Sequence, residues 1–181
     1  KALVLTASVV LITIASNYLF NNFYLASSAV NSLYAVNAQV ETKAVGSQGV
    51  VVSTQKEASQ VGLQVLKDGG NAIDAAVAVG YALAVSDPCC GNLGGGGFMV
   101  ARLADGKETF INFRETAPLK ANANMYLDKK DNLIEGLSRN GYLAVGVPGT
   151  VKGLNYALDK YGTMQLERVI KPAIDLAEDG F

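Results

Sequence analysis

The sequence predicts an α/β fold that begins near residue 48 and continues to the end of the 181-residue chain. Helical segments with capping signals and apolar stripes lie on either side of a pair of short strands, and an Asp-Gly hairpin signal joins those strands. Apolar residues make up 50% of the chain, which is enough for a sizeable core. The formal net charge of −1 provides no basic surface for nucleic acid or acidic lipid.

The N-terminal stretch differs from the rest of the chain. After the first position no charged residue appears until Glu41, and residues 2–15 form an apolar run. Residues 36–38 have the small-residue pattern that signal peptidase recognises. We therefore predict a signal peptide over residues 1–38, a linker over residues 39–48, and an exported protein, periplasmic or extracellular.

An uncleaved membrane anchor is the alternative interpretation, because apolar residues continue as far as Leu25. Asparagines interrupt this stretch, so it falls short of the run of about 20 apolar residues that a spanning helix needs. They are Asn17, Asn21 and Asn22. We expect no stable membrane insertion.

A short apolar strand over residues 49–52 is predicted to precede the first helix. Thr54–Glu57 has the form of a capping box, in which the Thr hydroxyl and the Glu carboxylate satisfy free N–H groups at a helix start. The helix that follows carries an apolar stripe and is expected to stop at Gly69-Gly70.

The second helix is predicted over residues 72–85. Asn71 is expected to cap it, and Asp74 in its first turn opposes the positive end of the helix dipole. Because this helix is apolar nearly all round, it should be buried on most faces and packed closely against a sheet. Pro88 should end it.

Four consecutive glycines, residues 94–97, precede a predicted strand over residues 98–103. A phosphate cradle is disfavoured because no Lys-Ser or Lys-Thr follows and the chain enters a strand instead of a helix. A flexible linker is disfavoured because apolar elements flank both sides. We interpret the run as backbone that must pack closely or adopt a positive φ angle.

Asp105-Gly106 predicts the hairpin turn, and Thr109–Phe113 alternates like a returning strand, which places Arg114 at a strand end. Pro172 should kink or divide the last helix. The remaining predicted elements are a polar loop, a tight strand-to-helix turn and two helices, over residues 120–140, 144–150, 151–161 and 166–179.

The chain contains no His, which removes the commonest general base and metal ligand. Its two cysteines, Cys89 and Cys90, are adjacent. Adjacent cysteines form no ordinary disulfide framework and lack the paired spacing of a zinc site, so we expect small, buried apolar residues there. We predict no metal and no cofactor.

Four stretches together resemble the N-terminal part of the large subunit of gamma-glutamyltranspeptidases. The similarity extends over residues 49–181, and no one of the stretches would be specific by itself. They are Gly69–Ala76, Gly91–Met99, Phe113–Pro118 and Gly146–Val151. Many relatives have His at the position of Asp87, which we interpret as the tolerated end of a buried helix.

The resemblance implies an N-terminal-nucleophile hydrolase with an αββα sandwich, of which this chain would form part. The family's precursor cuts itself into large and small subunits. The freed N-terminal Thr of the small subunit attacks the γ-glutamyl amide of glutathione or a related compound, and the acyl group passes to water or to an amino acid. That Thr lies in a Thr-Thr-His motif, which a chain without His cannot contain. We expect no catalytic residue here and no activity from this piece alone.

The resemblance also implies one substrate-binding residue. In the family, the Arg of the Arg-Glu-Thr-Ala-Pro stretch binds the α-carboxylate of the γ-glutamyl donor, and here that residue is Arg114. A guanidinium can bind a carboxylate with two parallel hydrogen bonds. The ordinary alternative is an Arg114 that forms a surface ion pair.

Three functions therefore stay open at this point. The first is an exported γ-glutamyl transferase or hydrolase whose partners are γ-glutamyl compounds and the small subunit from the same precursor. The second is a related acylase that acts on β-lactam side chains. The third is a non-catalytic exported α/β domain that binds a small carboxylate through Arg114.

Overall fold

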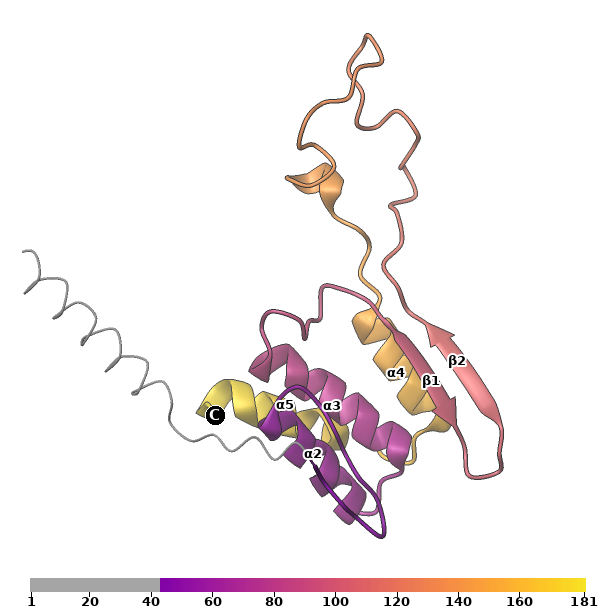
Figure 1. Cartoon of the computed structure of the whole chain (residues 1–181), viewed down its shortest axis with the longest axis vertical. Helices are drawn as coiled ribbons and strands as arrows, with labels where there is room; N and C mark the ends of the chain where they lie inside the picture. Colours follow the sequence, from indigo (N-terminus) through magenta and orange to yellow (C-terminus); the bar gives the residue numbers. More distant parts are fainter. Residues whose placement is uncertain (1–42) are drawn as a thin grey trace, which may run out of the picture. The chain divides into compact units, whose positions relative to one another are not determined.

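The computed structural model describes residues 43–181, and the predicted signal peptide over residues 1–38 lies outside them. Residues 45–181 form one unit of mixed helix and strand (Figure 1). No helix in this described part is long and apolar enough to cross a membrane. In chain order the elements are α2 (Lys56–Lys67), α3 (Ala72–Ser86), β1 (Phe98–Arg102), β2 (Glu108–Asn112), the 3₁₀ turn η1 (Tyr142–Ala144), α4 (Thr150–Tyr161) and α5 (Leu166–Asp179).

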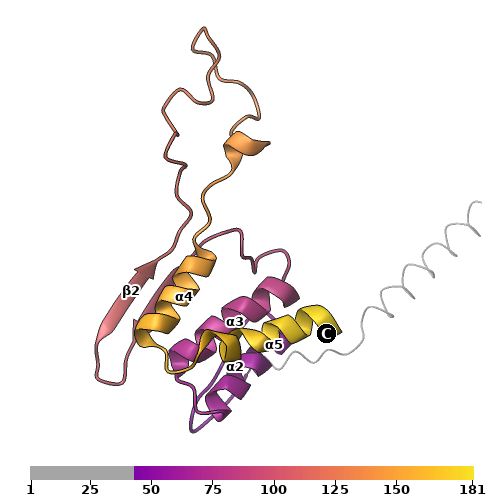
Figure 2. The same ribbon diagram turned by 180° about the vertical axis from the view of Figure 1, so that it is seen from behind.

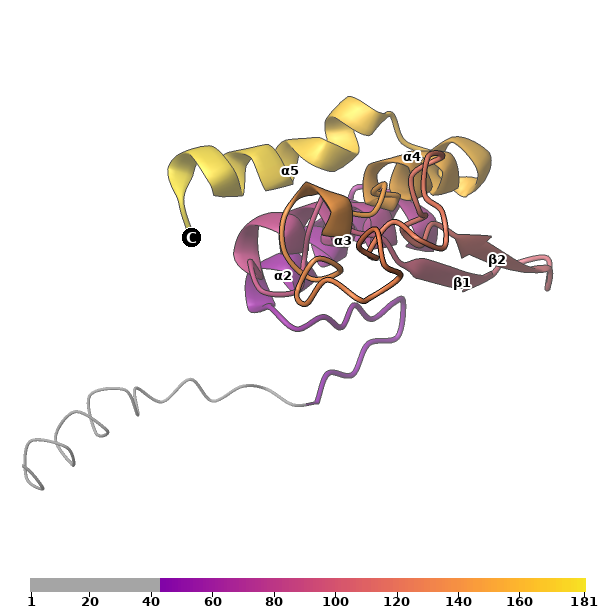
Figure 3. The same ribbon diagram turned by 90° about the horizontal axis from the view of Figure 1, so that it is seen from above.

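Helix α3 lies at the centre of the unit, where it packs against α2, α4 and α5 (Figures 1 and 3). Its burial on most faces confirms the prediction from its apolar sequence. The predicted close packing against a sheet is confirmed only in part: the extensive contacts of α3 are with helices, although Met99, Ala101 and Ile111 of the two strands belong to the same core. A side-chain carbon added at Gly80 would lie 3.1 Å from Leu154 Cδ1 on α4, so this glycine allows two helices to approach each other.

The predicted cap of α3 is confirmed, and it does more than start a helix. Asn71 Oδ1 accepts the backbone N–H groups of Ile73 and Asp74, and the Asp74 carboxylate accepts the N–H of Asn71 in a complete capping box. Asp74 is fully buried. It also accepts hydrogen bonds from the Thr163 hydroxyl at 2.7 Å and from the N–H groups of Thr163 and Met164, so it ties α3 to the turn between α4 and α5.

Two predictions at the start of the unit are wrong. Residues 49–52 form no strand, because the structure pairs them with no neighbouring strand. The predicted capping box at Thr54–Glu57 does not form either: Gln55 occupies the N-cap position of α2, without a side-chain hydrogen bond. Thr54 instead donates its hydroxyl to Asp87 Oδ2 at 2.7 Å, just beyond the end of α3. A long-range contact has replaced the local one.

The hairpin is confirmed with small shifts of its ends. Strands β1 and β2 pair antiparallel, with Phe98 opposite Asn112 and Arg102 opposite Glu108, and Gly106 in the turn has φ of 85°. One face of the hairpin turns Ile111 into the core. The other face carries Phe98 and Phe110, whose rings stack 5.9 Å apart and are 58% and 61% exposed.

The polar loop is confirmed, and it projects away from the helices (Figures 1 and 2). The predicted strand-to-helix turn is reduced to a single bridge between Thr116 and Val147, followed by Gly149 as the N-cap of α4. Pro172 does not divide the last helix, and α5 is continuous from Leu166 to Asp179.

The expectation of buried cysteines is wrong. Cys89 and Cys90 are exposed and are joined to each other by a disulfide. They follow Pro88, which with Asp87 ends α3 and turns the chain outward, so neither side chain reaches the core.

Candidate functional site

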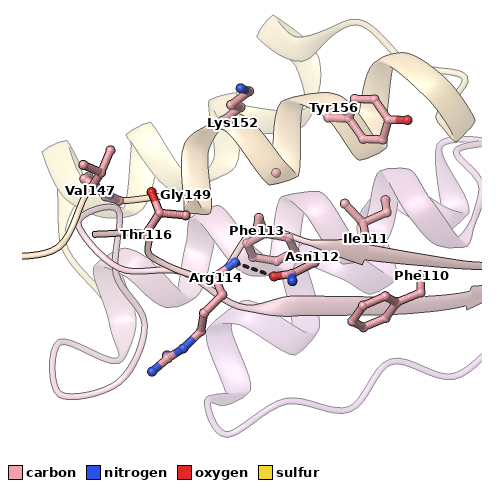
Figure 4. Close-up of a pocket in the computed structure, with 12 residues that line it drawn as sticks. Phe110, Ile111, Asn112, Phe113, Arg114, Thr116, Val147, Gly149, Lys152 and Tyr156 are labelled. Atoms are coloured by element: carbon pink, nitrogen blue, oxygen red, sulfur yellow. Dashed lines mark hydrogen bonds between the residues drawn. The ribbon is translucent and has the colours of Figure 1, made fainter. Parts of the chain in front are cut away.

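A cleft of about 490 Å³ lies between α4 and the end of β2 (Figure 4). Its walls come from the chain around Arg114, from the turn at Val147–Gly149, and from the exposed side chains of Lys152 and Tyr156 on α4. Two of the four stretches that carry the family resemblance, Phe113–Pro118 and Gly146–Val151, line the cleft, and a third, Gly91–Met99, packs against both. The fourth, Gly69–Ala76, lies elsewhere, at the start of α3, where Asp74 accepts hydrogen bonds from Thr163 and Met164.

Phe113 fixes the floor of this region. Its ring packs between Gly97, just before β1, and Gly153 on α4: a carbon added at Gly97 would lie 2.9 Å from Phe113 Cε2, and one added at Gly153 would overlap Phe113 Cγ. Any larger residue at either glycine would displace the ring. Because Phe113 precedes Arg114, this packing fixes the backbone from which the arginine extends.

The glycine run is confirmed as a place of close backbone approach. A carbon added at Gly96 would lie 2.6 Å from the Phe113 carbonyl oxygen and 2.7 Å from the Glu115 nitrogen. Gly95 contributes its carbonyl oxygen, which accepts the N–H groups of Gly149 at 2.8 Å and Thr150 at 3.1 Å. The alternative of positive φ angles in the run is wrong, since the positive-φ glycines of the described chain lie elsewhere.

The side chain of Arg114 extends from this closely packed segment and is 64% exposed. Its backbone N–H donates to Asn112 Oδ1 at 3.0 Å, and its Nη1 lies 3.0 Å from Glu115 Oε2. In Figure 4 the guanidinium of Arg114 extends away from Lys152 and Tyr156, which lie on the opposite side of the cleft. The predicted site residue is therefore presented at the surface and paired with one carboxylate.

Glu115 is a site residue to which the sequence analysis gave no role, although it stands within the Arg-Glu-Thr-Ala-Pro stretch. Its side chain is 30% exposed, and Oε2 is buried with an ion-pair distance to Arg114 but without hydrogen-bond geometry. Its backbone rests on Gly96, and the next residue, Thr116, exchanges two backbone hydrogen bonds with Val147 at 2.8 and 3.2 Å. In the sequence, the signal that could have pointed to Glu115 was its position directly after Arg114.

This arrangement can bind an anion but contains no catalytic constellation. One Nη of Arg114 is occupied by Glu115, and the exposed remainder of the guanidinium can donate to a carboxylate. In the described part of the chain, one group has three metal-ligand atoms within 4.8 Å of one another: Asp87, Cys89 and Cys90. The disulfide uses both of those sulfur atoms, so it leaves them unable to act as thiolate ligands.

The sequence profile named gamma-glutamyltranspeptidase matches residues 58–181, which is more than half of the chain. The chain belongs to this family. It is 57% identical over 165 residues to the glutathione hydrolase proenzyme of Pseudomonas sp. strain A14, covering 91% of this chain and 29% of that protein.

Solved structures and other family members agree with this assignment. The crystal structure of Helicobacter pylori gamma-glutamyltranspeptidase matches with a TM-score of 0.73 and 54% identity, over 77% of this chain and 40% of that one. The acylase ACY 1 proenzyme of Pseudomonas sp. strain V22 is 46% identical over 146 residues, which is 76% of this chain and 26% of that protein. The chain thus spans less than a third of the length of these two proenzymes.

Proposed function

We propose that this chain supplies the carboxylate-binding arginine of an exported enzyme that hydrolyses or transfers γ-glutamyl groups. The observation that carries the proposal is Arg114, a mostly exposed guanidinium on backbone that three glycine-containing segments hold in place. A γ-glutamyl donor presents a free α-carboxylate, and the planar fork of an arginine matches that group. These contacts fix the backbone from which the arginine extends, which limits how far its guanidinium can be displaced when the donor binds.

The chemistry is proposed to come from the rest of the family's fold. An N-terminal Thr of the small subunit would attack the γ-glutamyl amide, its own α-amino group accepting the hydroxyl proton. Arg114 would hold the far end of the glutamyl group, so that the amide carbon lies at the nucleophile. The acyl-enzyme would then react with water or with an amino acid. The substrates are accordingly glutathione and other γ-glutamyl compounds.

We also propose that the described unit forms one side of an αββα sandwich. The hairpin covers helices with one face and leaves Phe98, Val100 and Phe110 exposed on the other. An apolar sheet face of this kind is typical of a face that packs onto a second sheet.

The acylase alternative has support in the 46% identity to ACY 1. The two functions differ in what Arg114 would bind, because a β-lactam side-chain amide need not carry an α-amino acid carboxylate. We favour the γ-glutamyl function because of the higher identity to a glutathione hydrolase.

The test is Arg114→Lys in the full-length protein. Loss of the two-pronged hydrogen bonds should raise KM for a γ-glutamyl anilide by about tenfold or more, since a hydrogen bond to a charged group contributes about 1.5–3 kcal/mol. Self-cleavage into subunits should be unchanged. Arg102→Lys, an exposed arginine on the same hairpin, is the matched control. Unchanged kinetics for Arg114→Lys would remove this residue from the site, and turnover of β-lactam side-chain amides alone would favour the acylase.

A further inference from the structure

The exposed cysteine pair after α3 takes no part in the proposed γ-glutamyl site. Cys89 and Cys90 are bonded to each other across a single peptide unit, and neither lines the cleft at Arg114. A disulfide stabilises a fold mainly by closing a loop in the unfolded chain, and the effect grows with loop length. A bond between neighbours encloses no intervening residue, so stability does not account for this pair.

The backbone around the pair is held without help from the sulfur atoms. The N–H groups of Cys90 and Gly91 both donate to the Asp87 carbonyl oxygen, at 3.1 and 2.8 Å. Asn92 Nδ2 donates to the Cys90 carbonyl oxygen at 3.2 Å. These bonds involve only main-chain atoms of the cysteines, so the loop can keep its course whether the sulfurs are joined or separate.

A buried carboxylate lies beside the pair and suits its reduced form. Asp87 is 8% exposed, and its Oδ2 accepts the Thr54 hydroxyl. Its Oδ1 lies 3.4 Å from Cys89 Sγ. A sulfur in a disulfide carries no proton and cannot donate, so among residues 43–181 this oxygen gains a hydrogen-bond donor only when Cys89 is a thiol. Reduction would therefore give Asp87 Oδ1 a protein hydrogen-bond donor that the disulfide does not provide.

From these contacts we propose that Cys89–Cys90 is a reversible thiol–disulfide exchange site for low-molecular-weight thiols. The thiolate of one small thiol attacks one sulfur, and the other sulfur leaves as a thiolate that takes a proton from water. A second small thiol then attacks the mixed disulfide and releases the first cysteine. The sum is one protein disulfide and two thiols giving one protein dithiol and one small disulfide, with two electrons transferred to the protein.

The test uses the full-length protein, purified without reductant, and titration with mixtures of cysteamine and cystamine. Neither compound contains a γ-glutamyl bond, so the result does not depend on the proposed enzymatic activity. Alkylation and mass spectrometry of the folded protein should find no free thiol at Cys89 or Cys90 before reduction and two after it, and cystamine should restore the bond. Free thiols in the absence of reductant, or a bond that yields only after unfolding in denaturant, would overturn the proposal.

Two variants sharpen the test. Cys90→Ser leaves one cysteine without a neighbour to resolve a mixed disulfide, so the protein should retain one bound cysteamine after exposure to cystamine. Asp87→Asn weakens the acceptor for the Cys89 thiol, so half-reduction should require a several-fold higher ratio of cysteamine to cystamine. The matched control is Asp105→Asn, in the exposed hairpin turn. An unchanged half-reduction point in Asp87→Asn would refute the part assigned to the carboxylate.

Discussion

At the scale of single residues, the fold stabilises the charged form of the buried Asp74 side chain. Burial by itself would raise the pKa of Asp74, but the Thr163 hydroxyl and the N–H groups of Asn71, Thr163 and Met164 together lower it below the ordinary value of 3.8. The charged form is thus the form that the folded state favours. Its contribution to stability is fully present above the unfolded pKa and is lost as the pH falls through the lower folded pKa.

We therefore predict that Asp74→Asn lowers the free energy of unfolding by about 3 kcal/mol at neutral pH, since several charge-assisted hydrogen bonds are weakened in a buried site. The difference from the wild type should shrink as the pH falls from 3.8 towards the lower folded pKa of Asp74, below which the wild-type carboxylate is protonated as well. Urea unfolding at several pH values measures both effects. Asp159→Asn on the exposed face of α4 is the control. A loss that is equal at all pH values would show that packing, and not charge, decides the result.

Arg114 shows how far a single residue can be predicted from sequence. Its place at a strand end follows from the alternation of Thr109–Phe113, and its role follows from the resemblance. The direction of its side chain and its pairing with Glu115 do not follow, because both depend on how Gly96 and the Thr116–Val147 bridge hold the backbone. These contacts join segments that are far apart in the chain.

At the scale of elements, the glycine run is the feature that most constrains the site. Its four members are not equivalent: a carbon added at Gly94 would meet nothing within 4 Å, whereas one added at Gly96 would meet backbone atoms on both sides of Arg114. Backbone cannot rotate away as a flexible side chain can, so the cost at Gly96 must appear as a shift of the chain.

Gly96→Ala should lower the free energy of unfolding by about 2 kcal/mol. It should also raise KM for γ-glutamyl donors, since the segment that carries Arg114 must move. Gly94→Ala, two positions earlier in the same run and with nothing within 4 Å of the added carbon, should leave both quantities nearly unchanged. Thermal unfolding and steady-state kinetics of the two full-length variants make the comparison. If Gly94→Ala is as harmful as Gly96→Ala, flexibility of the run and not close approach is what the fold requires.

The elements that the sequence predicted well are those whose signals are local. The Asn71 cap, the apolar stripe of α2 and the Asp-Gly hairpin turn each depend on residues within a few positions of one another. The failures have long-range causes. Thr54 does not cap α2 because its hydroxyl donates to Asp87, which is 33 positions away. Residues 49–52 form no strand because they lack a neighbouring strand to pair with. The exposure of Cys89 and Cys90 depends on how the chain leaves α3.

At the scale of the whole molecule, the described unit leaves one sheet face uncovered. Phe98 and Phe110 stack on the face of the hairpin opposite Ile111, and Val100, which pairs with Phe110, is 78% exposed on the same face. The chain corresponds to 29% of the length of its Pseudomonas relative, so most of such a protein's fold would lie in other segments. The proposed sandwich assigns the uncovered face to a second sheet built from those segments.

Phe110→Ser in the full-length protein tests whether this face of the hairpin is covered by a second sheet or exposed to solvent. If a second sheet packs on Phe110, the substitution removes a buried aromatic ring and should lower the free energy of unfolding by about 3 kcal/mol or more. If the face stays as exposed as it is in residues 45–181, a surface substitution should change it by less than about 0.5 kcal/mol. Tyr142→Ser on the projecting loop, where the ring is 99% exposed, is the control.

Because Phe98 stacks on Phe110, Phe98→Ser should lower the free energy of unfolding by a similar amount. The double variant should lose less than the sum of the two single losses, as expected for residues in contact. No loss in either single variant would contradict a sandwich built on this face, whereas additive losses would contradict a contact between the two rings.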